Sequence, residues 1–255
     1  MGFLGEERIG EINKNNFGSL MEIIEYRSNK DIVVRFNETN NTVKTFYHDF
    51  RRGKVRNPYD RSLYGVGYNG VGKYKASENG KDTFIYMFWK DMMKRCYSEK
   101  FHEKRPSYKD CSVSSKWHNL QDFGAWFDNN YYKVDDETMS LDKDILVKGN
   151  KVYSPDTCVF APRRINSLFV KNDANRGDYP IGVTFNEKDN IYLAKFKGGN
   201  RKNVHIGSYK TAEDAFYAYK KKKENYIKQM ADYYKDKIPD ILYKAMYSYE
   251  ISITD

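Results

Sequence analysis

Four charged side chains near the middle of the chain are of types that take part in phosphate and metal chemistry. Asp142 and Asp144 lie among apolar residues, and Arg163 and Arg164 open a later predicted helix. Carboxylate oxygens are ligands that Mg²⁺ and Mn²⁺ prefer, and guanidinium groups donate charge-assisted hydrogen bonds to phosphate. The carboxylates could instead accept turn hydrogen bonds or form ion pairs with the two arginines. The residue types leave both roles open.

Residues 139–170 predict the elements that would position these side chains. An apolar stretch around Leu141 predicts a strand, and residues 148–151 predict a turn. A second short strand is predicted at 158–160, followed by a helix at 163–170. Two strands and a helix in so short a segment are the shape that a ββα-metal nuclease requires.

The cysteines and one histidine raise the question of a zinc site. Zinc ligands in proteins are usually cysteine and histidine, and the residues of these types in the central region are Cys96, Cys111, His118 and Cys158. None of the cysteines has a partner at CxxC spacing, so the pattern favours buried, inert thiols over structural zinc. His205, in the strand before Gly207, is expected to pack in the core.

The composition favours an intracellular protein with a polyanionic partner. The chain has 255 residues, a formal net charge of +9 and three cysteines, an odd number that argues against a secreted disulfide scaffold. Its first residues lack the basic flank and apolar core of a secretory signal, and no apolar run reaches the roughly 18 residues needed to span a bilayer. We therefore expect a reduced, soluble protein without membrane contact, and excess positive charge often serves nucleic acid.

The N-terminal part predicts a β module with a basic surface. Residues 18–50 alternate apolar and polar side chains around turn residues, which indicates an antiparallel meander. Residues 44–75 contain eight basic and two acidic side chains, a local charge of +6. A solvated face and a phosphate-binding surface both fit this charge. Under the second hypothesis the candidate contacts are Arg51, Arg52, Lys54 and Arg56. A flexible junction is predicted at 76–81.

Helical spacing predicts the elements between the junction and Asp142. At 83–100, Phe84, Met87, Phe88, Met92 and Cys96 form an apolar stripe expected to face the core. A short strand is expected around Val113. A second amphipathic helix is expected at 116–129, with Trp117 and Trp126 in the core.

The C-terminal part predicts three short strands and a helix. The strands are expected at 181–185, 191–196 and 203–209, separated by turns rich in Asn and Gly. Thr211 can cap the following helix, with Asp214 three residues on. Lys220 to Lys223 are expected on a solvated helix face. Pro239 should end the helix, and the tail at 236–255 either packs back or binds a partner.

Residues 178–230 resemble the AP-two/ERF-type DNA-binding domain, which also occurs in phage homing endonucleases. The matching residues are Gly182, Val183, Tyr192, Ala194, His205, Ile206, Gly207, Ser208, Tyr209, Thr211, Ala212, Ala215, Ala218 and Tyr219. In that family the sheet enters the major groove of double-stranded DNA. The resemblance implies outward-facing contacts at Thr184, Lys188, Tyr192, Lys195 and Lys197, with Arg201 and Lys202 near the backbone. Tyr192 stands where the family usually has Trp.

Residues 84–169 resemble the HNH-like nuclease region that precedes such a domain in phage proteins. The residues that carry the resemblance are Trp89, Met92, Arg95, Cys96, Tyr108, Val113, Trp117, Phe123, Trp126, Leu141, Asp142, Asp144, Tyr153, Pro155, Cys158, Ile165 and Asn166. In the family an Asp-His pair ends the first strand; the Asp helps to hold a divalent cation and the His takes a proton from water. Here the pair is Asp142 and Lys143.

The resemblance implies a variant nuclease site. Asp142 and Asn166 would hold Mg²⁺ or Mn²⁺, Lys143 or Asp144 would assist the water or the phosphate, and Arg163 and Arg164 would steady the backbone. An ammonium group at its ordinary pKa is protonated, so Lys143 could act as a base only if its surroundings lowered that pKa. It could instead bind the scissile phosphate.

Together these features predict a multidomain α+β protein of the phage homing-endonuclease type, located in the cytoplasm of a bacterial host. The expected parts are an N-terminal β module (1–75), an HNH-like ββα-metal region (81–170), an ERF-type domain (178–235) and a tail (236–255). The expected activity is metal-dependent DNA cleavage. A DNA-binding protein without cleavage and a phage inhibitor that binds a host defence protein or nucleic-acid complex remain alternatives.

Overall fold

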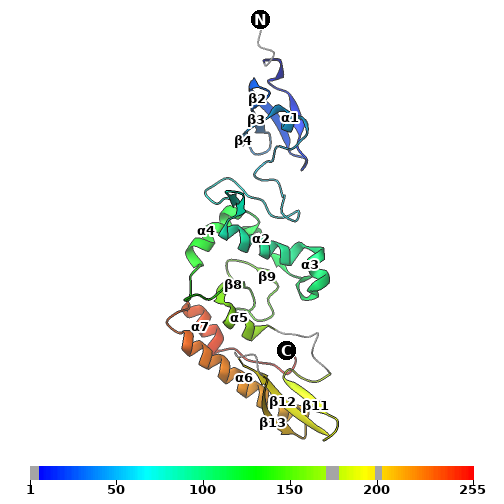
Figure 1. The fold of residues 1–255 in the computed structure, drawn as a ribbon, viewed down its shortest axis with the longest axis vertical. Helices are drawn as coiled ribbons and strands as arrows, with labels where there is room; N and C mark the ends of the chain where they lie inside the picture. The colour runs from blue at the N-terminus through cyan, green and yellow to red at the C-terminus, as the bar shows by residue number, and fades with distance from the viewer. Residues whose placement is uncertain (1–5, 171–177, 199–202) are drawn as a thin grey trace. The chain divides into compact units, whose positions relative to one another are not determined.

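The computed structural model describes residues 6–170, 178–198 and 203–255 (Figure 1). Its architecture is mixed α+β, with a four-stranded antiparallel sheet near the N-terminus, central helices, and a three-stranded C-terminal sheet packed on a long helix. The α+β class is therefore confirmed. The chain forms two compact units, the first ending at residue 129 and including 151–155, the second comprising 130–150 and 156–255.

The N-terminal sheet is the meander that the alternating sequence predicts. Its strands run in the order β1 (Ile12–Lys14), β2 (Leu20–Ser28), β3 (Asp31–Phe36) and β4 (Thr42–Thr45), all antiparallel. The 3-10 helix η1 (Glu6–Arg8) precedes it and α1 (Tyr47–Arg51) follows. Alternate side chains of β2 and β3 point inward, and their fully buried members, with Phe50 of α1, form the core: Met21, Ile23, Ile32, Val34 and Phe36.

The glycine-rich segment after α1 lies against the central helices. The backbone N–H of Tyr68 donates to the carbonyl of His118 at 2.9 Å, and Leu120 N–H returns a bond to Tyr68 at 3.0 Å. A Cβ atom on Gly67 would lie 2.9 Å from the Trp89 ring. The Trp89 ring therefore leaves no room for a side chain at this position, which explains the glycine.

A hairpin and a group of helices complete the first unit. The predicted junction at 76–81 contains strands β5 (Ser77–Glu78) and β6 (Lys81–Asp82), joined by Asn79 and Gly80 at positive φ of 51° and 75°. The elements that follow are α2 (Phe84–Tyr97), α3 (Glu99–Lys104), η2 (Pro106–Tyr108), β7 (Ser112–Val113), η3 (Ser115–Trp117) and α4 (Leu120–Asn130). β7 pairs in parallel with β9 (Val152–Tyr153).

The buried face of α2 is rotated from the predicted stripe. Phe84 and Met87 are about half exposed, whereas Trp89 and Met93 are fully buried beside Met92. The prediction is confirmed for Met92 and Cys96 and wrong for Phe84 and Met87, because the buried face is centred on Trp89, whose indole N–H donates to the Trp117 carbonyl at 2.7 Å. Burying this large ring with its donor satisfied favours the rotated face.

The second unit begins with a hairpin and a helix. β8 (Met139–Asp142) pairs antiparallel with β10 (Val159–Pro162), and α5 (Arg163–Phe169) follows directly. Asp142 stands opposite Val159 in this register. The strand–loop–strand–helix order predicted at 139–170 is present, and α5 buries Ile165 and Leu168.

The C-terminal sheet contains β11 (Val183–Asn186), β12 (Ile191–Lys197) and β13 (Asn203–Tyr209) in sequence order, and α6 (Ala212–Tyr234) packs along it (Figure 1). The Thr211 hydroxyl accepts from Asp214 N–H at 3.1 Å, so the predicted cap is confirmed. After Pro239, α7 (Asp240–Tyr247) lies against α6, and Ile251 joins the core, so the tail packs back.

No helix in the described part of the chain has both the length and the apolar character needed to cross a bilayer.

Candidate nucleic-acid interface and ββα site

The two faces of the C-terminal sheet differ sharply in character. On β12, Ala194 and Phe196 are buried against α6, so the alternate residues Leu193, Lys195 and Lys197 lie on the opposite, outer face. The register places Leu193 between Thr184 and Ser208, and Lys195 beside His205. We call this surface the outer face of the sheet; its residues are Thr184, Leu193, Lys195, Lys197, His205 and Ser208.

Three of the predicted DNA contacts lie on this outer face. Thr184 and Lys197 are exposed and Lys195 is half-buried. Lys188 is exposed in the turn between β11 and β12, where its N–H donates to the Asn186 side chain at 3.1 Å. Arg201 and Lys202 lie outside the described residues.

The outward placement of Tyr192 is wrong. Its ring lies 4.9 Å from Phe185 and 5.4 Å from Tyr179 between ring centroids, within the cluster that packs against α6. Successive strand residues point to opposite faces, so Tyr192 shares the inner face of Ala194 rather than the face of Lys195. Counting outward from the alanine would have identified Leu193 instead.

Sequence reasoning also missed two polar residues on β13. His205 is exposed rather than packed, and its Nε2 lies 3.5 Å from the Ser208 hydroxyl. A β-bulge between Ala194 and Lys195 shifts the pairing of β13, and a bulge changes which face a residue occupies. The sequence carries no clear signal for that bulge.

The lysine run of α6 serves two purposes. Lys221 and Lys222 are exposed, as a solvated face predicts. Lys220 instead pairs with Glu224 at 2.6 Å and donates to the Ile251 carbonyl at 2.8 Å. Lys223 lies over the Phe196 ring, and burial lowers its pKa to about 8. Half of the run therefore packs or pairs against the rest of the fold and is only partly exposed.

The N-terminal candidates are all exposed. Arg51 forms an ion pair with Glu11 at 3.4 Å, and Arg52, Lys54 and Arg56 are solvent-accessible on the segment that leaves α1. Their exposure is compatible with phosphate contact and equally with a solvated face.

In the ββα unit Asp142 fastens the loop that follows β8. Its Oδ1 accepts the backbone N–H groups of Asp144 and Ile145, each at 2.7 Å. This is the turn hydrogen-bonding that the sequence offered as an alternative to metal binding. Burial raises the pKa of Asp142 despite these two bonds.

Lys143 is bound within the same loop. Its side chain is 7% exposed, and Nζ contacts the two Asp144 oxygens at 2.7 and 2.8 Å and the Asn150 carbonyl at 2.7 Å. Asn150 returns a bond from Nδ2 to the Lys143 carbonyl at 2.8 Å. The lysine thus closes the loop from 143 to 150, and its ammonium is satisfied by protein groups.

The two arginines at the start of α5 are exposed, and neither forms an ion pair with Asp142 or Asp144 within the described ranges. The Arg164 guanidinium lies 5.8 Å from the centroid of Tyr233 on α6 and also interacts with the hydroxyls of Tyr234 and Tyr226. Arg164 therefore joins α5 to α6. Asn166 lies half-buried in the middle of α5.

The carboxylate oxygens of Asp142 and Asp144 are poorly suited to bind a divalent cation, because most of them already contact other protein groups. Only Oδ2 of Asp142 lies outside the turn hydrogen bonds, and both oxygens of Asp144 contact the Lys143 ammonium. A cation there would face a fixed positive charge, with Asn166 as the other predicted ligand. Mg²⁺ is usually held by one or two carboxylates with water and substrate oxygens.

The raised pKa of Asp142 predicts a stabilising substitution. Asp142→Asn keeps an oxygen that can accept both N–H groups and removes a buried negative charge, so we expect a higher melting temperature at pH 7 in metal-free buffer. A carboxyl with a raised folded-state pKa destabilises the fold when ionised, so the gain should vanish below the ordinary value of 3.8. Thermal denaturation of both proteins across this pH range measures it. A lower melting temperature at pH 7 would show that the ionised carboxylate stabilises the loop.

Comparison of the chain with known protein families, with curated proteins and with solved structures finds no match. The function must therefore be argued from the residues and their arrangement.

Proposed function

We propose that this chain binds double-stranded DNA through the outer face of its C-terminal sheet. The observation that carries the proposal is the division of this sheet: one face is core against α6, and the other presents Lys195 and Lys197 with hydroxyl and imidazole groups. Strands of a β-ribbon or β-sheet can enter the major groove of B-DNA, where such groups reach phosphates and base edges.

The resemblance to AP-two/ERF-type domains supports the same conclusion. That family uses its sheet for DNA, and strand order, the turn glycine Gly182 and the Thr211 cap of this chain agree with its pattern. The net charge of +9 adds the long-range attraction that brings a protein to a polyanion. The carried-over contacts are Thr184, Lys188, Lys195 and Lys197.

The proposed role of the ββα unit is structural and DNA-associated rather than catalytic. The resemblance to HNH-like nucleases implies that Lys143 or Asp144 assists the water. The Lys143 ammonium is held by Asp144 and the Asn150 carbonyl, and both Asp144 oxygens contact that ammonium. A charged lysine in such contacts cannot accept a proton from water. We therefore propose a DNA-binding protein of the phage homing-endonuclease type whose central unit has lost cleavage.

A salt titration tests DNA binding. Each lysine that neutralises a phosphate releases a counterion, which contributes about −0.9 to the slope of log affinity against log salt concentration. Contacts by Lys188, Lys195 and Lys197 predict a slope of about −2.7 for a duplex oligonucleotide. Fluorescence anisotropy between low and moderate KCl measures the slope. Weak duplex affinity with little dependence on salt concentration would instead favour a protein partner.

Cleavage is the second candidate, and one observation favours it. Burial raises the pKa of Asp142, and carboxylates with perturbed pKa values gather at functional sites. Because Lys143 is occupied, we expect supercoiled plasmid to remain intact with Mg²⁺ or Mn²⁺. Nicking that is absent with EDTA and lost in Asp142→Ala would overturn the non-catalytic proposal while leaving DNA binding in place.

A further inference from the structure

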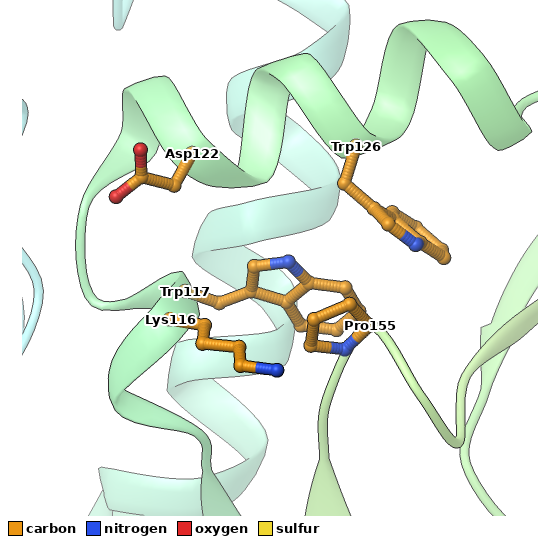
Figure 2. A pocket seen from close by; sticks show the side chains of 5 residues that line it. All are labelled: Lys116, Trp117, Asp122, Trp126 and Pro155. Atoms are coloured by element: carbon orange, nitrogen blue, oxygen red, sulfur yellow. The ribbon is translucent and has the colours of Figure 1, made fainter.

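The central helices form a pocket of about 310 Å³ that the DNA-binding proposal does not use. Its lining comes from η3, α4 and the residues after β9, all within the first unit: Lys116, Trp117, Asp122, Trp126 and Pro155. In Figure 2 Trp117 lies between Asp122 on one side and Trp126 on the other, with the Pro155 ring close to the Trp117 ring in this view. We call this the Trp126 pocket.

The walls of the Trp126 pocket are fixed by contacts beneath them. The Trp117 carbonyl accepts from the Trp89 indole, and the Trp117 ring packs edge-on against Phe123 at a centroid distance of 5.3 Å. Ser114 N–H donates to the Tyr153 carbonyl at 2.8 Å, which ties the chain before η3 to the chain before Pro155. A preformed pocket binds its ligand without the cost of ordering the walls.

The lining has the chemistry of a base-binding site. Trp126 is partly exposed and lies 4.6 Å from Trp117 between ring centroids, so it offers an aromatic surface at the pocket on which a flat ring can stack. Lys116 supplies a donor and a positive charge, and Asp122 supplies an acceptor; both are exposed. A nucleotide has the matching parts, because it carries a π face, exocyclic amino groups and a phosphate.

We propose that the Trp126 pocket binds one unpaired nucleobase of a DNA strand, which stacks on Trp126 and hydrogen-bonds to Asp122 while Lys116 contacts its phosphate. This inference rests on the proposed function, since a DNA-binding chain is what brings a strand to the pocket. A base inside a duplex cannot enter it, so the ligand is a single strand or a base turned out of the helix.

The test compares Trp126→Ala with the unaltered chain for binding of a labelled single-stranded oligodeoxyadenylate. Loss of one stacked base should weaken binding about 5- to 150-fold, and Trp126→Phe should recover part of the affinity because it keeps an aromatic face. Duplex affinity should stay unchanged in Trp126→Ala. Equal oligodeoxyadenylate affinity for the unaltered chain and Trp126→Ala would overturn the proposal.

A second variant tests the hydrogen bond and guards against misfolding of the first. Adenine carries an exocyclic amino group and thymine does not, so the unaltered chain should prefer oligodeoxyadenylate over oligothymidylate, and Asp122→Ala should abolish this preference. The ratio of the two affinities is insensitive to the charge that the substitution removes. An unchanged ratio contradicts the role of Asp122. If duplex binding fails while this ratio and the Trp126 effect hold, the pocket stands and the sheet proposal falls.

Discussion

Replacing Lys195 and Lys197 together by alanine should weaken duplex DNA binding about 60-fold at 0.1 M salt. Each phosphate contact changes the logarithm of the affinity by about 0.9 per tenfold change in salt concentration. One contact therefore strengthens binding about eightfold at 0.1 M relative to 1 M salt, and the factors of two contacts multiply to about 60. Both side chains lie on the outer face of the C-terminal sheet, away from its core. Fluorescence anisotropy with one duplex measures the change.

Lys221→Ala with Lys222→Ala provides the matched control. This pair removes the same charge from exposed positions of α6, the helix that covers the other face of the sheet. Its effect should be confined to the loss of net charge, and much smaller. Equal losses in the two double variants would mean that overall charge, rather than the sheet face, drives binding.

Gly182→Ala should destabilise the second unit by about 2–4 kcal/mol, because it adds backbone strain to steric overlap. Gly182 has φ of +81°, and a Cβ atom there would lie 2.1 Å from Cδ2 of Tyr219 on α6. Tyr219 is 7% exposed and part of the core, so its ring has little room to move. Urea unfolding measures the loss.

Gly149→Ala separates the two causes. Gly149 has φ of +78° but nothing within 4 Å of an added Cβ, and it belongs to the same unit. Only the backbone cost of about 1–2 kcal/mol should remain. If both substitutions cost the same, the close approach of the sheet and α6 at Gly182 contributes nothing to stability.

The elements with strong local signals could be predicted from the sequence. The alternation of Met21, Ile23, Ile32 and Val34 fixes which residues of the N-terminal sheet are buried, and all four are. The Thr211 cap and the alanine-rich face of α6 likewise depend on neighbours in the chain. Such features require only the period of a strand or helix and the chemistry of a cap.

Features that depend on side-chain direction or distant packing could not be predicted as well. Alternation along β12 from Ala194, which the sequence already indicates as a core residue, places Tyr192 on the inner face. The resemblance to the family instead led to the prediction that Tyr192 faces outward. The bulge beside Lys195 and the rotation of α2 toward Trp89 follow from tertiary packing. Lys143 is the clearest example of what the sequence could not predict. Its residue type and position indicate phosphate binding or proton transfer, whereas in the structure its ammonium contacts Asp144 and the Asn150 carbonyl and closes the loop between them.

The most direct test of DNA binding by the sheet is the salt dependence of duplex affinity, measured in parallel for the unaltered chain and the Lys195→Ala, Lys197→Ala double variant. The account predicts two straight lines on a double-logarithmic plot, with the variant shallower by about 1.8 because two phosphate contacts are gone. Parallel lines would show that neither lysine touches a phosphate and would contradict DNA binding by the outer face of this sheet.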